Sequence, residues 1–133
     1  MRVSNSGSTL VMVAPNGARW GKDANPNMPL TSLEIVEETI SCAKAGADVL
    51  HLHVRDASGK HTLDAGRYRE TLQEIERALP GFPIQITTEA AGIFDVQQQV
   101  DCLREVRPEA VSISVREMAR ETKLASTAYG LCQ

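Results

Sequence analysis

The side chains best placed to do chemistry are two histidines separated by one residue, His51 and His53, in the segment HLHVRD at 51–56. An apolar run that starts at Ala47 leads into this segment and a turn at 57–60 follows it, a pattern typical of a buried strand. Alternate side chains of a strand share a face, so both imidazoles face the same way, about 6.6 Å apart along the strand. Imidazoles in this arrangement can bind one Zn²⁺ ion, whose catalytic sites have three protein ligands and an open position.

A second interpretation of the same spacing is a pair of hydrogen-bonded core histidines without a metal. The position of the pair at the end of an apolar strand, with Arg55 next on the same face, favours the metal site. Arg55 itself fits either an inward-facing arginine or an ion pair with Asp56 that closes the turn. His61 lies in a polar turn, and we expect it to be exposed to solvent.

The composition is that of one soluble globular domain: 133 residues, 42% hydrophobic and 23% charged, with a formal net charge of −3. This weak acidity, with basic residues scattered along the chain, gives no electrostatic case for nucleic acid or a membrane surface as partner. The three cysteines (Cys42, Cys102 and Cys132) form no CxxC pair, and the first ten residues lack the pattern of a signal peptide. We therefore predict a reduced, cytoplasmic protein.

Strands and helices are expected to alternate along the chain. Helix-start signals occur at Thr31 with Glu34 as a capping box, at Asp64, and at Asp95 with Gln98. The predicted strands are 9–14, 47–55, 82–88 and 110–115. The predicted helices are 31–46 with Leu33 and Val36 on its buried face, 64–79, 96–106, and one that begins near Thr122.

This alternation predicts a parallel sheet with crossover helices. Polar residues gather just beyond the carboxyl end of each strand, which is where (β/α)₈ barrels build their active sites. Neither GxGxxG nor GxxxxGK[ST] occurs, so a nucleotide-binding fold is disfavoured. We predict an α/β fold of the TIM-barrel class, with residues 1–133 forming the N-terminal half of a barrel (about its first four β/α units) and residues 1–8 a disordered lead-in.

Four segments in this order resemble the β-keto acid cleavage enzymes: APNGARWGKDANPNMPLT, CAKAGADVLHLHVRDASGKHTLD, IQITTEAAG and PEAVSISVRE. The resemblance covers nearly the whole chain, and HLHVRD preceded by AGAD is its most specific part. It implies a Zn²⁺-dependent (β/α)₈ barrel about twice this long. It also implies condensation of a β-keto acid with acetyl-CoA to give acetoacetate and a new CoA ester, in a homo-oligomer.

Residue by residue, the resemblance implies that His51 and His53 are metal ligands for Zn²⁺ or another divalent metal. Thr87 matches a hydroxyl residue that holds the keto-acid end of the substrate, with Thr88 beside it. Glu89 begins a wall segment where other members carry Gly-Gly, and we expect it to act as an acid/base or to pair with an arginine such as Arg19 or Arg116. The third metal ligand of the family is a glutamate in the second half of the barrel, beyond Gln133.

Arg19 lies in the loop where the aminohexanoate-cleaving members have an acidic residue that binds an amine. An arginine there implies preference for an anionic or polar substrate tail, because its planar fork suits a carboxylate. An ordinary surface arginine is the alternative.

The length of the chain keeps other functional readings open. It could be a truncated, non-catalytic half-barrel that needs a second half-barrel chain, or another metal-dependent carbon–carbon lyase or aldolase. A half-barrel would expose two strand edges and leave its inner face uncovered.

Overall fold

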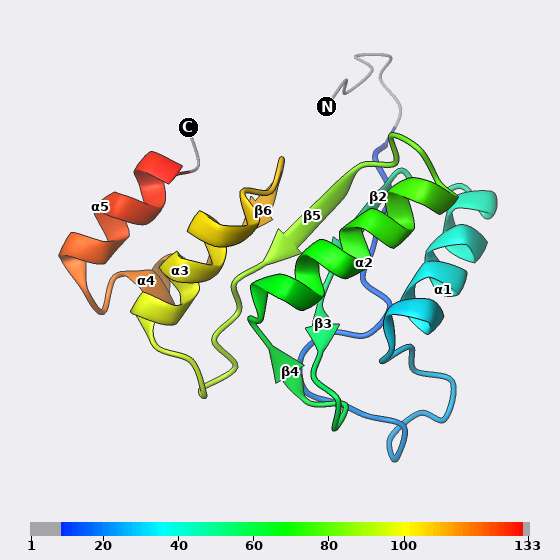
Figure 1. Cartoon of the computed structure of the whole chain (residues 1–133), viewed down its shortest axis with the longest axis horizontal. Helices are drawn as coiled ribbons and strands as arrows, with labels where there is room; N and C mark the ends of the chain where they lie inside the picture. Colours follow the sequence, from blue (N-terminus) through cyan, green and yellow to red (C-terminus); the bar gives the residue numbers. More distant parts are fainter. Residues whose placement is uncertain (1–8, 132–133) are drawn as a thin grey trace.

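A computed structural model describes residues 9–131, so the predicted lead-in at 1–8 and Cys132 lie outside the described residues. Its centre is a parallel sheet with the strand order β1-β2-β5-β6 (Figure 1). The four strands are β1 (Met12–Val13), β2 (Val49–Leu52), β5 (Ile84–Thr87) and β6 (Val111–Ser112). The predicted parallel α/β arrangement is therefore confirmed, with strands shorter than expected.

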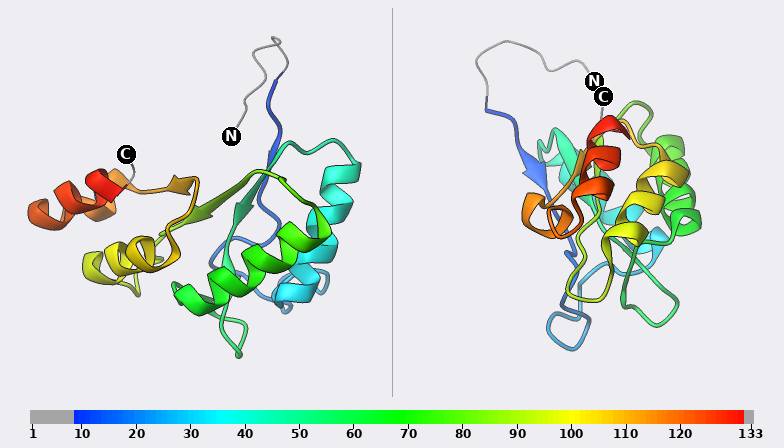
Figure 2. Two further views of the ribbon diagram at one scale, coloured as in Figure 1. Left: turned by 45° about the horizontal axis from the view of Figure 1, so that its top comes forward. Right: turned by 90° about the vertical axis from the view of Figure 1, so that its left-hand side faces the viewer.

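Helices lie against one face of this sheet, because each crossover returns on the same side (Figures 1 and 2). These crossover helices are α1 (Ser32–Lys44), α2 (Ala65–Ala78) and α3 (Val96–Val106). Two more helices follow in the chain, α4 (Val115–Met118) and α5 (Thr122–Leu131), and α5 packs on α3. Within residues 9–131, no helix has the length and apolar character needed to cross a membrane.

The core lies between the sheet and α1, α2 and α3. It contains the strand residues Leu50, Leu52 and Ile86, which are at most 1% exposed, and Tyr68 and Ile75 from α2. Because side chains alternate along a strand, the residues between these core positions face the opposite side of the sheet, away from the three crossover helices. That face carries the histidines.

The predicted strand 47–55 is instead two strands, because the chain leaves the sheet at His53. The amide of Asn16 donates to the His53 carbonyl (3.0 Å), and β3 (Val54–Arg55) then pairs antiparallel with β4 (His61–Thr62). Asp56 closes the hairpin by accepting from the backbone of Ser58 and Lys60, an Asx-type turn. The turn predicted at 57–60 therefore connects the two strands of a hairpin. The sequence analysis did not predict its second strand, β4, or the pairing of β4 with β3.

Helix starts were predicted more accurately than strand lengths. Thr31 and Asp95 make the expected capping boxes with Glu34 and Gln98, and Asp64 caps α2. The predicted buried face of α1 was wrong in one detail: Leu33 is 65% exposed, whereas Ile35 and Thr39 are buried. A threonine is tolerated there because its hydroxyl donates to the Ile35 carbonyl at 2.6 Å.

Glu34 ties the long 18–30 loop to α1, and its environment gives a pH-dependent contribution to stability. Its carboxylate accepts from the Lys22 ammonium and from the backbone amides of Leu30 and Thr31. These contacts, the one from Lys22 first, lower the pKa of Glu34 to about 2. The folded-state pKa is depressed, so this stabilisation is present above the unfolded pKa of about 4.3 and is lost as the pH falls towards about 2.

We expect Glu34→Gln to lower the urea midpoint of unfolding at pH 7, because the neutral amide loses the ionic part of these contacts. At pH 3.5 the gap between wild type and variant should narrow, because the unfolded wild-type chain then binds a proton at Glu34. Urea denaturation followed by circular dichroism at the two pH values measures both gaps. A gap that stays constant would show that the Glu34 charge adds nothing.

Candidate active site

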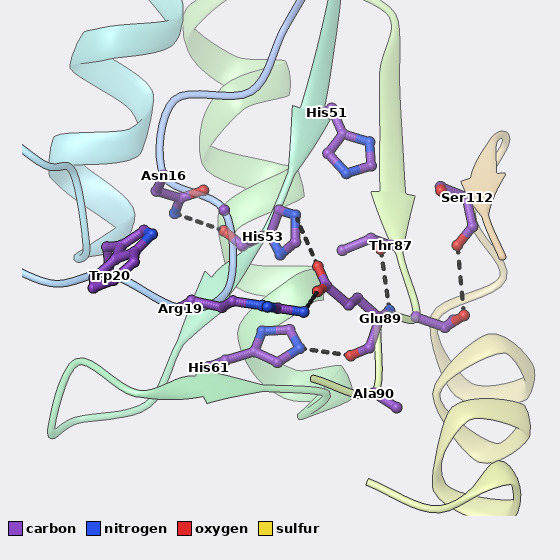
Figure 3. Close-up of polar contacts among 12 residues, drawn as sticks. Asn16, Arg19, Trp20, His51, His53, His61, Thr87, Glu89, Ala90 and Ser112 are labelled. Atoms are coloured by element: carbon purple, nitrogen blue, oxygen red, sulfur yellow. Dashed lines mark hydrogen bonds and ion pairs between the residues drawn. The ribbon is translucent and has the colours of Figure 1, made fainter. Parts of the chain in front are cut away.

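The polar residues of interest meet at the carboxyl edge of the sheet, on the face that the crossover helices leave open. His51 lies in β2 opposite Gln85 of β5, and Thr87 ends β5 opposite Ser112 of β6. His53 follows β2 directly. The parallel register therefore brings the two histidines at the end of β2 and the threonine at the end of β5 to one edge, as expected (Figure 3).

The two histidine rings have the separation that a shared metal ion requires. Their centroids are 5.0 Å apart, in an edge-to-face arrangement. Two imidazoles on one tetrahedral zinc ion, with Zn–N bonds of about 2.0–2.1 Å, have centroids roughly 5 Å apart. The Nδ1 atom of His51 is hydrogen-bonded to the side-chain oxygen of Gln85 at 2.7 Å.

His53 is held in the neutral state that a metal ligand needs. It is 3% exposed, and burial lowers its pKa to about 3, with the neighbouring imidazoles and Arg55 adding to the effect. Its Nδ1 atom is buried without a hydrogen-bond partner. A buried, unprotonated imidazole with a free lone pair fits a divalent transition metal.

The described part of the chain brings together two candidate ligands, His51 and His53, and not three. No group of three histidine, cysteine, aspartate or glutamate side chains within residues 9–131 is placed to hold a metal ion. The two histidines fit a metal by residue type, ring separation and charge, and a further ligand has to come from outside this set.

Glu89 lies beside the histidines and brings the strand-end loops together. Its carboxylate is 4.0 Å from Nε2 of His53 and 3.8 Å from the guanidinium of Arg19 (Figure 3). Of the two arginines considered for it, Arg19 is the one it pairs with, whereas Arg116 is exposed on α4. The site thus carries a carboxylate between an imidazole and a cation.

The two threonines after β5 are both buried but differ in their contacts. The hydroxyl of Thr87 accepts from the Glu89 amide at 3.1 Å, and its carbonyl accepts from the Tyr68 hydroxyl at 2.8 Å. Thr88 is fully buried, and its hydroxyl contacts the Ser112 carbonyl at 3.5 Å. Thr87 is therefore directed to the histidine edge, and the Thr88 hydroxyl is engaged within the sheet.

Arg19 is 74% exposed on the loop after β1, and a second arginine holds that loop in place. Arg55 is 4% exposed, and its guanidinium donates to the carbonyls of Asn16, Gly17 and Trp20 (2.7–3.2 Å) and of Gly59 (2.9 Å). Of the two alternatives, Arg55 is the inward-facing arginine, since Asp56 is used by the hairpin turn. These hydrogen bonds from Arg55 fix the start of the loop that carries Arg19.

His61 was expected to be exposed, and that was wrong. It is 5% exposed, with its ring centroid 5.6 Å from that of His53 and its Nε2 atom 2.7 Å from the Glu89 carbonyl. The β3–β4 pairing brings His61 next to His53 and Glu89. The turn at 57–60 could have signalled this return, whereas nothing in the sequence marked Gln85 as the partner of His51.

A cavity of about 650 Å³ adjoins the site. Arg19 and His61, which both contact Glu89, line it together with the hairpin residue Lys60 and with Ile93. It therefore opens between the 18–23 loop, the hairpin and the segment after Glu89, and its charged lining is mostly basic.

Comparisons with known proteins identify the family of the chain. The model of the family described as beta-keto acid cleavage enzyme matches residues 8–129. The 3-keto-5-aminohexanoate cleavage enzyme of Fusobacterium nucleatum is 38% identical over 90 residues, which are 67% of this chain and 33% of that enzyme. The 3-oxoadipate:acetyl-CoA acetyltransferase of Cupriavidus necator is 28% identical over 115 residues, 86% of this chain and 40% of that enzyme.

A solved structure shares the fold. The apo structure of ObcA superposes with a TM-score of 0.55 at 24% identity, covering 68% of this chain and 23% of that one. The chain spans about a third of the length of the cleavage enzyme from F. nucleatum. With a family match over nearly all of its residues, the chain belongs to the β-keto acid cleavage enzyme family.

Proposed function

We propose that this chain carries the metal- and keto-acid-binding half of an enzyme that condenses a β-keto acid with acetyl-CoA, giving acetoacetate and a new acyl-CoA. The observation that carries the proposal is the pair of imidazoles, His51 and His53, whose ring centroids lie 5.0 Å apart at the carboxyl edge of a parallel sheet. The supporting comparison is the acetyl-CoA acetyltransferase activity named for the C. necator relative. The half-barrel at 1–133 would need its second half to complete a (β/α)₈ barrel.

In this proposal His51 and His53 hold Zn²⁺ or another divalent metal. Bound there, such an ion supplies Lewis-acid polarisation of a substrate carbonyl. The chain's own groups bind and orient: the Thr87 hydroxyl, at the same edge, donates to a substrate oxygen. Burial of His53 excludes water from one side of the site and keeps that imidazole unprotonated.

Arg19, Glu89 and the adjoining cavity are proposed to receive the substrate tail. The guanidinium of Arg19 is mostly exposed and only 3.8 Å from Glu89, a loose pair that a carboxylate on the substrate can replace. We propose an anionic or polar tail, such as the second carboxylate of 3-oxoadipate, in preference to an ammonium. Thr88 contributes through the wall that it builds behind Thr87 and Glu89.

A second candidate function follows from the open face of the sheet. The three crossover helices cover one face (Figures 1 and 2). His51 lies on the other face, because it alternates along β2 with the core residues Leu50 and Leu52. A half-barrel that binds metal but turns nothing over until a second chain, or a second copy in a homo-oligomer, covers this face fits that observation. Such a partner would also supply the missing metal ligand. We also propose that the protein acts in the cytoplasm.

One assay separates the two candidates. The zinc-loaded chain is incubated with acetyl-CoA and either 3-oxoadipate or 3-keto-5-aminohexanoate, and acetoacetate is measured. We expect faster product formation from 3-oxoadipate, and an Arg19→Gln variant should reduce that preference by about tenfold, the loss of one charged contact. Metal binding without any product from either acid would select the non-catalytic half-barrel. Preference for the amino acid substrate would contradict the proposed tail.

A further inference from the structure

We propose that Glu117 is a positioning residue for the candidate site: its carboxylate holds in place the segment 88–91, which carries Glu89 and ends at the wall of the cavity. The part of this inference that concerns ligand binding rests on the proposed function, because it takes that cavity to receive the substrate tail. Glu117 lies in α4, which follows β6, and its side chain reaches the segment that follows β5. It therefore links two neighbouring strand ends.

The backbone polar groups of residues 88–90 are all hydrogen-bonded, which fixes the course of this segment. Four of the six groups are bonded to the sheet and to nearby loops. Their partners are the Ser112 carbonyl, the Thr87 hydroxyl, the His61 ring, and the amides of Ile93 and Phe94. The other two groups, the Thr88 carbonyl and the Ala90 amide, are bonded to side chains of α3 and α4.

One carboxylate oxygen of Glu117 serves two buried donors. It accepts from the Ala90 amide at 3.1 Å and from the side-chain amide of Gln99 at 3.0 Å. The same amide group of Gln99 donates to the Thr88 carbonyl at 2.6 Å. Ala90 and Gln99 are each 1% exposed, so water has little access to either donor. Removal of the carboxylate would leave two buried N–H groups without partners, which is unfavourable.

The segment needs this support because its backbone is strained. Ala91 has a φ of 50°, in the left-handed region that residues with a Cβ rarely adopt. Strained conformations persist where the surrounding contacts determine them, and they cluster at functional sites. Glu117 can supply such a contact because α4 is itself anchored: Met118 is 5% exposed and packs in one apolar cluster with α3 and α5.

Two features of the site depend on where this segment lies. The Glu89 carboxylate is 3.8 Å from the guanidinium of Arg19, and Ala91 lines the cavity of about 650 Å³. Groups that bind a substrate have to be held to within about 0.5 Å by the residues behind them. We therefore expect Glu117 to control the affinity of the cavity for the substrate tail without contacting that tail.

The first test is hydrogen exchange of the full chain, followed residue by residue in ¹H–¹⁵N spectra. Glu117→Ala removes the acceptor, and the Ala90 amide should then exchange about 10-fold faster relative to the amides of α2. Glu117→Gln keeps a carbonyl oxygen that can accept from both donors, so it should exchange like wild type. Glu105→Ala, at an exposed position of α3, is the matched control and should leave the exchange of Ala90 unchanged.

The second test is a titration of the zinc-loaded chain with adipate, a stable dicarboxylate. We expect Glu117→Ala to raise the Kd for adipate about 10-fold, and Glu117→Gln and Glu105→Ala to keep the wild-type Kd. A purely structural role would reduce the number of folded chains that bind adipate and would leave their Kd unchanged.

Unchanged exchange of the Ala90 amide in Glu117→Ala would overturn the positioning role, and so would faster exchange with an unchanged Kd for adipate. If wild type itself binds no adipate, the proposed tail site fails. The exchange of the Ala90 amide then decides by itself whether Glu117 holds the segment 88–91.

Discussion

Replacing both His51 and His53 with alanine is expected to abolish stoichiometric Zn²⁺ binding while leaving the helical content largely unchanged. The rings of His51 and His53 are 5.0 Å apart, and among residues 9–131 no group of three histidine, cysteine, aspartate or glutamate side chains is placed to hold the ion instead. The helices are held by a core on the other face of the sheet. Zinc content by elemental analysis and far-ultraviolet circular dichroism measure the two effects.

His61→Gln is the matched control for this experiment. It also removes a buried imidazole at the site, but a glutamine can still donate to the Glu89 carbonyl. We expect it to keep stoichiometric zinc. A double alanine variant that retained one zinc ion per chain would show that the metal lies elsewhere.

Replacing Arg55 with methionine is expected to lower the free energy of unfolding by about 3 kcal/mol. The change keeps an apolar stem but removes four hydrogen bonds from a charged donor to the carbonyls of Asn16, Gly17, Trp20 and Gly59. Those carbonyls face a nearly fully buried side chain, so some would be left without partners. Urea denaturation measures the loss of stability, and limited proteolysis should show faster cleavage in the 17–23 loop.

Two further variants show whether this stabilisation depends on the guanidinium group of Arg55. Arg55→Lys keeps the charge but cannot reach four carbonyls from one nitrogen, so we expect most of the loss to remain. Arg104→Met on the exposed face of α3 removes an arginine whose guanidinium pairs with Asp101 at the surface, and it should cost little stability. A fully stable Arg55→Met variant would mean that the loop is held by other contacts.

The helix starts could be predicted from the sequence because their signals are local. A capping box needs residues only three positions apart, and Thr31 and Asp95 each carry the whole motif. The parallel sheet followed from the alternation of apolar runs with helical segments. Strand ends were less predictable, since the point where a strand leaves the sheet depends on distant groups such as Asn16, which takes the His53 carbonyl.

The site residues likewise divide into those with a local sequence signal and those whose position depends on distant contacts. His51 and His53 stood out because both lie in one short segment, and their ring separation fits the predicted metal site. His61 was misjudged because its burial comes from the pairing of β4 with β3. Arg55 was undecided because three of its four carbonyl partners lie 35–39 residues away. Long-range contacts of this kind have no signature in the spacing of residues.

The most direct test of the central claim is the zinc content of the purified wild-type chain, measured together with its mass in solution. The account predicts one tightly bound zinc ion per chain, in an assembly of two or more chains in which a neighbour completes the ligand set. A chain that takes up no zinc even when Zn²⁺ is added in excess, whatever its mass, would contradict the assignment of His51 and His53 as metal ligands.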